Sequence, residues 1–243
     1  MAEEPLIRMR DIYKKFGGVQ ALENVDFDLG YHEIVGLVGD NGAGKSTLIE
    51  ILSGVYRYDR GEIFLEGEKV DIRTPRDAKE LGIETVHQDL GLVDNLNVAK
   101  NMFLGKEPTK FGLLNKRYME RESQRILGEL RIEISSVRST VRNLSGGQRK
   151  AIAVGKAIYT KPRIVIMDEP TAALAVKETE EVLKLIIQLK ERGLSVVFIS
   201  HVLQEIFSAT DRIVVLRSGK KVGDKKTEET NMEETIRLMV GTR

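Results

Sequence analysis

The sequence of 243 residues predicts an α/β protein with a mostly parallel sheet flanked by helices. Three observations support this fold class. Between residues 34 and 217, short and continuous apolar runs alternate with segments of helical periodicity, which is typical of parallel strands covered on both faces. A glycine-rich loop joins the first apolar run to a helical segment. Residues 24–30, NVDFDLG, instead alternate apolar and polar side chains, which indicates an antiparallel β portion as well.

The strands can be assigned in chain order. Residues 24–30 predict a half-buried antiparallel strand, and GEIFLEGEKVDI (61–72) predicts two short strands around a turn at 66–68. A last hairpin is expected in RIVVLRSGKKVGD (212–224). The parallel strands are predicted from the apolar runs at 34–38, 82–87, 163–167 and 194–200.

The helices carry their own start and stop residues. In TPRDAKELG, Thr74 suits the N-cap, Pro75 the first helical position and Gly82 the exit. A helix is predicted over 177–193 from the apolar spacing of VLKLIIQL and the glycine at its end. The segment 89–162 has helical patterns and no convincing strand, so it is predicted to be a mostly helical insertion. A short terminal helix that closes the domain is expected around Met232, Ile236, Met239 and Val240.

Composition excludes several classes of protein. The 38 basic and 37 acidic residues leave a formal charge of +1, so no global field attracts nucleic acid, and no nucleic-acid partner is expected. The chain has no cysteine, which excludes disulfides and thiolate metal sites and suits a reducing cytosol. Its start, MAEEPLIRMR, does not resemble a signal peptide, and no apolar run approaches the roughly 18 residues of a membrane span. We therefore expect a soluble chain whose membrane role depends on a partner.

The stretch GDNGAGKST (39–47) predicts a nucleotide phosphate site. It fits G-x-x-x-x-G-K-[ST], follows an apolar strand and opens the helix KSTLIEILSG, which is the context that this motif requires. Glycines let backbone N–H groups approach a phosphate, and the helix N-terminus adds a favourable dipole. In this pattern Lys45 reaches the β- and γ-phosphates and the Ser46 hydroxyl binds Mg²⁺.

Polar side chains follow three of the predicted parallel strands. Asp168 stands where it can supply a further Mg²⁺ ligand, and Glu169 can polarise an attacking water as general base. Gln88 can coordinate Mg²⁺ and the water, and His201 can bond to the γ-phosphate. Because ligands bind at the carboxyl ends of parallel strands, these side chains are expected to converge. The other two histidines of the chain have no such support and receive no role.

A second glycine-rich stretch, LSGGQ (144–148), has two interpretations. Ser145 and Gln148 match a capping box, so the segment can be no more than a well-capped helix start. Gly146 and Gly147 also expose the backbone at the positive end of that helix, which favours an anion. Since the first loop already binds the phosphates, the second suits the γ-phosphate of a nucleotide bound to another copy.

GDNGAGKST, Gln88, LSGGQ, IVIMDEP and His201, in this order, resemble the nucleotide-binding domain of ATP-binding cassette (ABC) ATPases, which are P-loop NTPases. The resemblance covers essentially the whole chain. It implies a single domain, 1–243, with a catalytic core of 1–88 and 163–243 and a helical subdomain of 89–162. It also implies a head-to-tail homodimer that holds each ATP between one P-loop and the partner's LSGGQ.

The resemblance assigns roles by matching position. Phe16 stacks on adenine, with Tyr13 as the alternative. Ala175 is a departure, since the family often has an aspartate there that helps the two sites communicate, although sugar-class members often lack it too. The remaining assignments are Gln88, Glu169 and His201 for catalysis; Gly39, Asp40, Asn41, Gly42, Ala43, Gly44, Lys45, Ser46 and Thr47 for the nucleotide; Ser145, Gly146, Gly147 and Gln148 for the partner's ATP; and Ser46, Gln88 and Asp168 for Mg²⁺.

The match becomes closer in GDNGAGKSTLIEILSGVY, ETVHQDLGLVDNLNVAKNMFLG and DEPTAALAVKETEEV, which look like ATP-binding subunits of ribose-, xylose- and fructose-type sugar importers. This implies a membrane permease, contacted through the segment after Gln88, a separate sugar-binding protein and a place at the cytoplasmic face of the membrane. Leu90, Leu92, Val93 and Leu96 of that segment either pack within the insertion or form the docking surface. Alternatives are an exporter ATPase, a ribosome- or DNA-associated ABC ATPase and a simple P-loop kinase.

Overall fold

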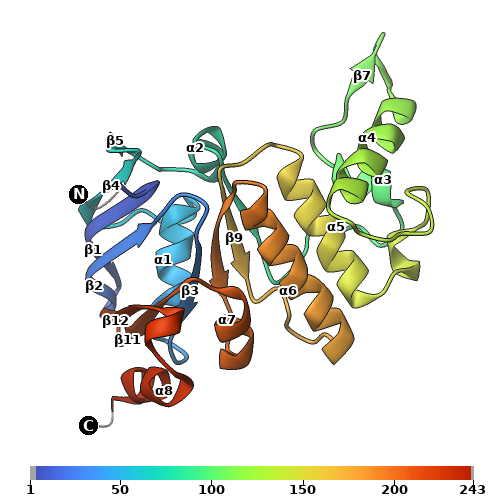
Figure 1. Ribbon diagram of the computed structural model, residues 1–243. Helices are drawn as coiled ribbons and strands as arrows, with labels where there is room; N and C mark the ends of the chain where they lie inside the picture. The colour runs from blue at the N-terminus through green and yellow to red at the C-terminus, as the bar shows by residue number, and fades with distance from the viewer. Residues whose placement is uncertain (1–3, 242–243) are drawn as a thin grey trace.

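A six-stranded sheet runs through the middle of the computed structural model, which describes residues 4–241 (Figure 1). Its strand order is β12-β11-β3-β10-β9-β6, and every neighbouring pair is parallel except β11 with β12. All four predicted parallel strands and the final hairpin are present. The strands are β3 (Ile34–Val38), β6 (Ile83–Val86), β9 (Ile164–Asp168), β10 (Ser195–Ile199), β11 (Arg212–Arg217) and β12 (Lys220–Lys226).

A second, four-stranded sheet is antiparallel and has the order β2-β1-β4-β5. It confirms the predicted antiparallel portion, including the turn at residues 66–67 between two short strands. Its strands are β1 (Ile7–Phe16), β2 (Val19–Leu29), β4 (Arg60–Leu65) and β5 (Glu68–Val70). The fold is therefore an α/β fold with an antiparallel β layer beside it, as predicted.

The main sheet is buried on both faces, which explains its continuous apolar strands. In β9, Val165 and Met167 belong to a core shared with the helices of the insertion and with α6 (Val176–Glu191). Ile164 and Ile166 belong to the opposite core, shared with α1 (Lys45–Leu52) and the antiparallel sheet. Period-two alternation thus divides one apolar strand between two layers.

The remaining helices follow the predicted punctuation. In α2 (Pro75–Glu80), Thr74 accepts a hydrogen bond from the Asp77 N–H at 3.3 Å, and Asp77 accepts one from the Thr74 N–H at 2.8 Å. The apolar face predicted for residues 177–193 is buried in α6. The others are α3 (Val98–Met102), α4 (Lys116–Glu129), α5 (Gly146–Ile158), α7 (Leu203–Ala209) and α8 (Met232–Val240), with single 3₁₀ turns at Val141–Asn143 and Thr227–Glu229.

The prediction that residues 89–162 contain no strand was wrong. A small hairpin pairs β7 (Thr109–Lys110) with β8 (Leu113–Leu114) and projects from the body of the molecule (Figure 1). Strands of two residues are too short to produce a period-two pattern. The rest of the segment consists of α3, α4, α5 and one 3₁₀ turn, joined by loops, and the proposed boundary between core and helical subdomain stays a prediction.

The terminal helix was predicted correctly, but its apolar residues do not all close the domain. Met239 is partly buried against the core, whereas Met232, Ile236 and Val240 are exposed. Their spacing of four residues places them along one side of α8, and the core contacts come from the adjoining residues Leu238 and Met239. No helix among residues 4–241 is long and apolar enough to cross a lipid bilayer.

One arginine joins the two sheets. Arg212, at the start of β11, donates to the Glu33 carboxylate at 2.7 Å, to Asp224 of β12 at 2.7 Å and to the Asp28 carbonyl of β2 at 2.7 Å. Burial opposes its charge, but the bonds to Glu33 and Asp224 outweigh this and raise the pKa of Arg212. The side chain therefore fixes the antiparallel layer against the main sheet.

We expect Arg212→Met to lower the free energy of unfolding by about 2–3 kcal/mol, because it removes the charged donor that the half-buried Glu33 and Asp224 carboxylates share. Urea unfolding of the purified chain measures this. Arg76→Met is the matched control: Arg76 pairs with Glu80 on the exposed surface of α2, so its loss should cost no more than about 0.5 kcal/mol. Equal effects of the two substitutions would contradict the structural role of Arg212.

Candidate nucleotide and catalytic site

The glycine-rich loop connects β3 to α1 with a backbone that other residues cannot adopt easily. Gly44, the N-cap of α1, has a φ of +106°, and a Cβ there would lie 2.8 Å from the Ala21 carbonyl oxygen. A Cβ on Gly39 would lie 2.3 Å from the Leu216 carbonyl oxygen. At Gly42, φ is +76° and a Cβ would meet nothing within 4 Å, so conformation rather than packing selects glycine. The loop is thus held against β2 and β11 at its ends and is open at its middle.

Lys45 holds the loop in its curled form. Its ammonium donates to the Gly39 carbonyl at 2.7 Å and to the Asp40 carbonyl at 3.1 Å, and the side chain is buried. Burial lowers the pKa of Lys45, and the charges of Glu169, Asp40 and Asp168 partly oppose that effect. An ammonium that is poorly solvated and bonded to two neutral carbonyls is well placed to bind an anionic partner.

The predicted carboxylates and histidine converge as expected. Parallel pairing sets Asp168 at the end of β9 beside Ile199 at the end of β10, and the Glu169 N–H donates to the Ile199 carbonyl at 3.0 Å. Glu169 has a φ of +49°, in the left-handed region that non-glycine residues rarely enter, and its carboxylate contacts Nε2 of His201. The strained turn aims Glu169 at the histidine rather than along the strand.

Asp168 is half-buried beneath this pair. Burial raises the pKa of Asp168, and the neighbouring charge of Glu169 raises it further, whereas His87, Lys45 and His201 act in the opposite direction. His87 therefore stands near the site, although no motif in the sequence had assigned it a role. Two carboxylates held together in this way favour the binding of a cation beside them.

Glu205 of α7 organises this edge of the sheet, and the sequence analysis missed it. Its Oε2 accepts from the Thr171 hydroxyl at 2.6 Å and from the Ser200 hydroxyl at 2.6 Å. These two residues belong to the loops that follow β9 and β10, so one carboxylate joins the segment that carries Glu169 to the segment that carries His201. Its position in the sequence, four residues after His201, could have indicated this role, because the first turn of a helix that follows β10 lies near the strand ends.

Gln88 lies on the loop after β6, which pairs with β9, so it reaches the same edge of the sheet. Its side chain is exposed, and its backbone carbonyl accepts a hydrogen bond from the Lys150 ammonium at 3.1 Å. Lys150 is buried on α5; burial lowers its pKa, and the charges of Glu169, Asp168 and Asp89 oppose this. No sequence signal had indicated Lys150, which links the Gln88 loop to the helix of LSGGQ.

Of the two candidate aromatic residues, Phe16 is the more accessible. It ends β1, and the following turn leads to Ala21, which contacts the P-loop at Gly44. Its ring is 39% exposed and meets Tyr56, a partner that the sequence analysis missed, at 4.9 Å between centroids. A cation lies 5.1 Å from the centroid of each ring, the Lys14 ammonium at Phe16 and the Arg60 guanidinium at Tyr13, so the two rings differ in exposure and not in this contact. Phe16 therefore suits stacking on a base better than Tyr13 does.

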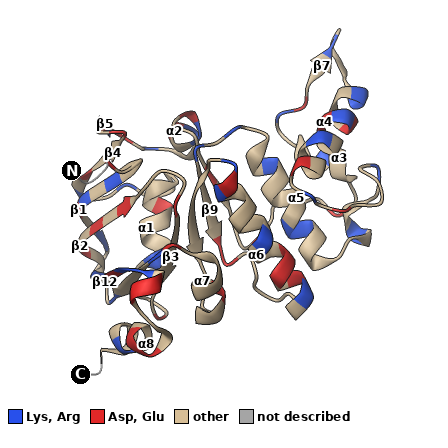
Figure 2. Ribbon diagram, in the orientation of Figure 1, with Lys and Arg blue, Asp and Glu red and all other residues tan. Residues whose placement is uncertain are grey.

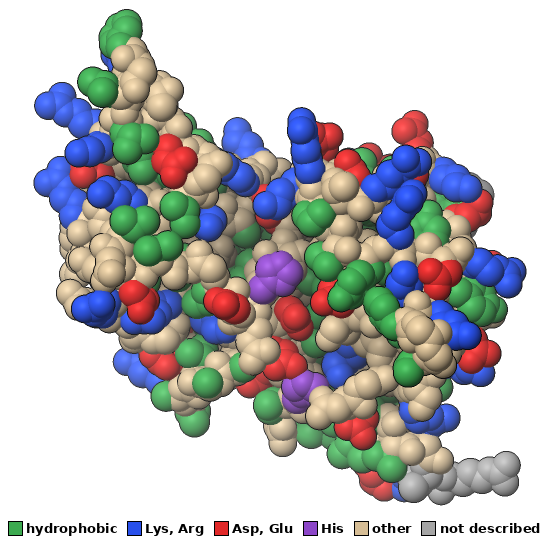
Figure 3. All heavy atoms as spheres, turned by 180° about the vertical axis from the view of Figure 1, so that it is seen from behind, with side chains coloured by type: hydrophobic (Ala, Val, Ile, Leu, Met, Phe, Trp, Pro, Cys, Tyr) green, Lys and Arg blue, Asp and Glu red, His purple; other side chains and the backbone are tan. Residues whose placement is uncertain are grey.

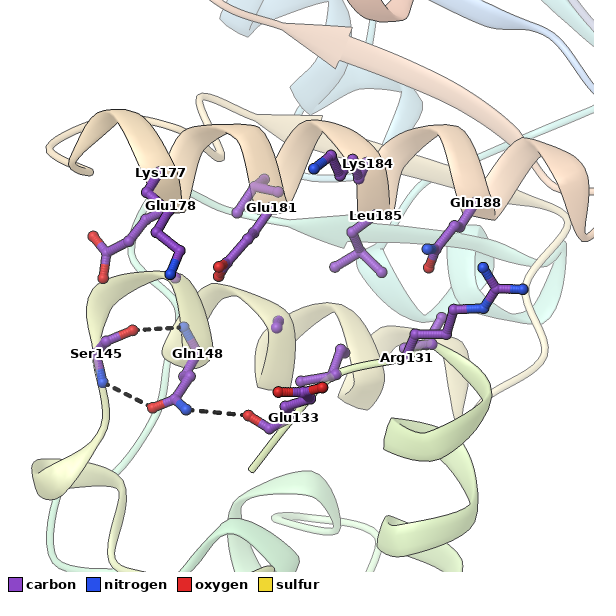
Figure 4. A pocket seen from close by; sticks show the side chains of 15 residues that line it. Arg131, Glu133, Ser145, Gln148, Lys177, Glu178, Glu181, Lys184, Leu185 and Gln188 are labelled. Carbon is purple, nitrogen blue, oxygen red and sulfur yellow. Dashed lines mark hydrogen bonds between the residues drawn. The ribbon is translucent and has the colours of Figure 1, made fainter. Parts of the chain in front are cut away.

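LSGGQ forms the start of α5, and the predicted capping box is present. Ser145 accepts from the Gln148 N–H at 3.3 Å, and Gln148 accepts from the Ser145 N–H at 3.1 Å. A cavity of about 650 Å³ between α5 and α6 begins here, and Figure 4 shows Glu178 reaching from α6 toward the start of α5. The Ser145 hydroxyl, then the N–H groups of Ala175 and Gly147, lower the pKa of Glu178. A carboxylate thus lies at the N-terminus that was predicted to favour an anion.

The residues present fit a Mg²⁺–nucleotide. Mg²⁺ is usually held by one or two protein oxygens together with phosphate oxygens and water. The Ser46 hydroxyl at the start of α1 and the Asp168 carboxylate offer hard oxygen donors, and the open middle of the P-loop leaves room for phosphate. These contacts with a ligand remain predictions, as do those of the other assigned residues.

Comparison with known proteins identifies the family. Residues 22–172 match the family described as ABC transporter, and the chain is 47% identical over 234 residues to a xylose/arabinose import ATP-binding protein of Sulfolobus acidocaldarius. The alignment covers 96% of this chain and 93% of that relative. The chain belongs to the ABC transporter family. The resemblance stated from the motifs is confirmed.

Other relatives of this ABC protein carry similar names. It is 42% identical to a fructose import ATP-binding protein of Rhizobium meliloti, covering 100% of this chain and 96% of that one. It is 44% identical to a ribose import ATP-binding protein of Clostridium tetani, covering 99% of this chain but 48% of the relative. The chain thus spans about half the length of the ribose-import relatives it matches.

Solved structures agree with the fold. The ADP conformation of an ATP-binding cassette of an ABC transporter superposes with a TM-score of 0.86 at 24% identity, covering 99% of this chain and 100% of that one. A dimeric, post-hydrolysis cassette bound to ADP and Pi gives a TM-score of 0.76 at 26% identity, covering 91% and 98%. The predicted P-loop NTPase fold is therefore confirmed.

The raised pKa of Asp168 predicts a pH-dependent stability difference. A carboxyl whose pKa is raised by folding stabilises the protein when protonated, and this contribution is lost as pH rises through the folded-state pKa. Asp168→Asn should therefore make the nucleotide-free, Mg²⁺-free chain more stable at pH 7, with a gain that shrinks toward the unfolded pKa of about 3.9. Urea unfolding at several pH values measures it, with Asp94→Asn on the exposed surface as control. A variant less stable than the parent at pH 7 would contradict the prediction.

Proposed function

We propose that this chain is the ATP-hydrolysing subunit of an ABC importer that drives sugar uptake. The observation that carries the proposal is the convergence of Lys45, Asp168 and the Glu169–His201 contact at one edge of the parallel sheet. This constellation suits phosphoryl transfer to water, in which positioning and charge stabilisation supply most of the catalysis. The names of the relatives favour import of sugars over the exporter alternative.

The chemistry of the site follows from its side chains. Lys45 would exchange its loop carbonyls for the β- and γ-phosphates, and Ser46, Asp168 and Gln88 would hold Mg²⁺, which neutralises charge on the phosphates. Glu169 would accept a proton from the attacking water. His201, now in contact with Glu169, would bond to the γ-phosphate and keep the water in line. Phe16 would stack on adenine.

A second copy would complete each site. The N-terminus of α5 at Ser145, Gly146, Gly147 and Gln148 offers N–H groups to the γ-phosphate of the partner's ATP. The dimeric cassette with ADP and Pi supports such an arrangement in the family. A head-to-tail homodimer of this chain would provide two complete sites, each with the P-loop of one copy and the LSGGQ of the other.

We further propose that a membrane permease docks at a groove of about 470 Å³ between the α2 region and the insertion. Its lining includes Leu90 and Gly91, which immediately follow the Gln88 loop, so binding of nucleotide can be transmitted there. Leu90, Leu92 and Leu96 are half-buried and Val93 is exposed, so the segment both packs within the insertion and offers surface. The chain would then lie at the cytoplasmic face of the membrane, with a sugar-binding protein acting through the permease.

Glu169→Gln should keep ATP binding and lower the turnover of ATP by roughly 10²–10⁴-fold, the usual contribution of a general base. A coupled phosphate-release assay gives the turnover, and equilibrium binding of a fluorescent ATP analogue gives the affinity. Glu180→Gln, on the exposed side of α6, is the control and should hydrolyse ATP normally. Near-normal hydrolysis by the Glu169 variant would remove this residue from the role.

Ser145→Arg should prevent the ATP-dependent dimer without much change in the ATP affinity of the monomer, because the large cation replaces the cap at the face that receives the partner. Sedimentation of the chain in the Glu169→Gln background, with and without ATP, measures the dimer. Ser145→Thr retains a capping hydroxyl and serves as control. An unchanged ATP-driven dimer of the Ser145→Arg variant would contradict the head-to-tail arrangement.

A further inference from the structure

The β7–β8 hairpin ends in exposed apolar side chains. Phe111 is 93% exposed, Leu113 75% and Leu114 49%. Single exposed apolar residues are ordinary, but these three share one short projection. Figure 3 shows hydrophobic atoms at the end of this projection, with Lys and Arg atoms beneath them. A cluster of exposed apolar side chains of this kind indicates a surface that binds a membrane or another molecule.

The turn at the tip holds Phe111 in an unfavourable conformation. Lys110 pairs with Leu113, so Phe111 and Gly112 form the two-residue turn, with φ values of +54° and +78°. Asparagine and glycine are the usual residues where both φ values are positive, and a phenylalanine there is strained. Because its ring is almost fully exposed, packing within the chain does not compensate this strain. The Lys110 ammonium lies 5.6 Å from the centroid of this ring.

Hydrogen bonds at the base of the hairpin hold its tip in a defined position. The Asn115 N–H donates to the Pro108 carbonyl at 2.8 Å, and the Asn115 side chain accepts from the Tyr118 N–H at 3.2 Å as the N-cap of α4. The strained turn therefore stands on a closed base that continues directly into a helix of 14 residues.

The charge around the tip is positive. Residues 106–117 contain four basic side chains and one acidic one, whereas the whole chain has a formal charge of +1. The acid, Glu107, accepts from the Gly105 N–H at 3.0 Å, away from the turn. Figure 2 shows Lys and Arg at β7 and at the start of α4. Exposed aromatic and leucine side chains flanked by cations match the interface of an anionic bilayer, where rings enter the headgroup layer and cations meet phosphate.

The hairpin also lies on the appropriate side, an argument that rests on the proposed function. Lys106 and Gly105 line the groove assigned to the permease, and the hairpin begins three residues later. The projection is therefore continuous with the face that the proposed permease would hold toward the membrane. We propose that residues 109–114 insert Phe111 and Leu113 into the interface of an anionic leaflet, with Lys110, Lys116 and Arg117 on its headgroups.

The chain contains no tryptophan, so Phe111→Trp introduces a single fluorescent probe at the tip. With vesicles of phosphatidylcholine mixed with phosphatidylglycerol, we expect a blue shift of its emission and quenching by brominated lipid. Vesicles of phosphatidylcholine alone, or added salt, should abolish most of the shift. Val240→Trp, on the exposed side of α8, is the matched probe and should not respond.

A second pair of variants tests the apolar ring and the positive charges separately, by vesicle flotation. Phe111→Asn suits the turn and removes the ring, so the hairpin should persist while the partition coefficient falls at least about tenfold. Replacing Lys110 and Lys116 by Gln should lower it about fivefold for each charge. No blue shift at position 111 with anionic vesicles, or an equal shift at position 240, overturns the proposal; absence of lipid binding would leave a protein surface of the permease as the partner of the tip.

This test is separate from that of the ATPase. None of the substituted residues lies at the nucleotide site, so each variant should hydrolyse ATP as the parent does. Vesicle binding without ATP hydrolysis would refute the proposed function and leave the lipid contact standing. ATP hydrolysis without vesicle binding would refute the lipid contact and leave the proposed ATPase function standing.

Discussion

The placement of β10 between β3 and β9 is the constraint on which the site depends. Val196 pairs with both Ile34 and Val165, so three parallel strands end at one level. The P-loop leaves β3, Asp168 ends β9 with Glu169 directly after it, and His201 follows β10. Parallel strands bring residues far apart in sequence to a common edge, which hydrogen-bonded hairpins cannot do. Glu205 then joins two of the three exits through hydroxyl groups, so the edge stays in register beyond the strands themselves.

Charge balance is the second requirement of this edge. Asp168 and Glu169 repel one another. Two partly desolvated ammonium groups lie near them, that of Lys45 on α1 and that of Lys150 on α5. Burial disfavours both lysines as cations, and the charges of the carboxylates offset part of that cost. Because Lys45 belongs to the P-loop and Lys150 to the helix of LSGGQ, this balance connects both glycine-rich loops to the same acids. It also connects them to Gln88, whose carbonyl Lys150 binds.

Much of this arrangement could be predicted from the sequence, and the omissions have identifiable causes. Continuous apolar runs predicted β3, β6, β9 and β10, because burial on both faces leaves that pattern. Motif spacing identified Lys45 at the start of α1, and Asp168, Glu169 and His201 at or just after the ends of strands. Lys150 and Glu205 were missed because they act from helices, where their neighbours in space are not their neighbours in sequence. The β7–β8 hairpin was missed for a different reason: its turn residue Phe111 violates the local preference that would have identified a turn.

Ala175 contributes a backbone N–H to the contact between α6 and the start of α5. Where the family often has an aspartate, this residue offers only its N–H, which donates to the Glu178 carboxylate at 3.3 Å. That carboxylate also lies 3.5 Å from the position of a Cβ on Gly146, so it occupies the start of α5 where a partner's phosphate would bind. The segment from Glu169 to Glu178 thus runs from the proposed general base to the LSGGQ helix. An anion arriving at that helix must compete with Glu178, and any displacement acts on the segment that begins at Glu169.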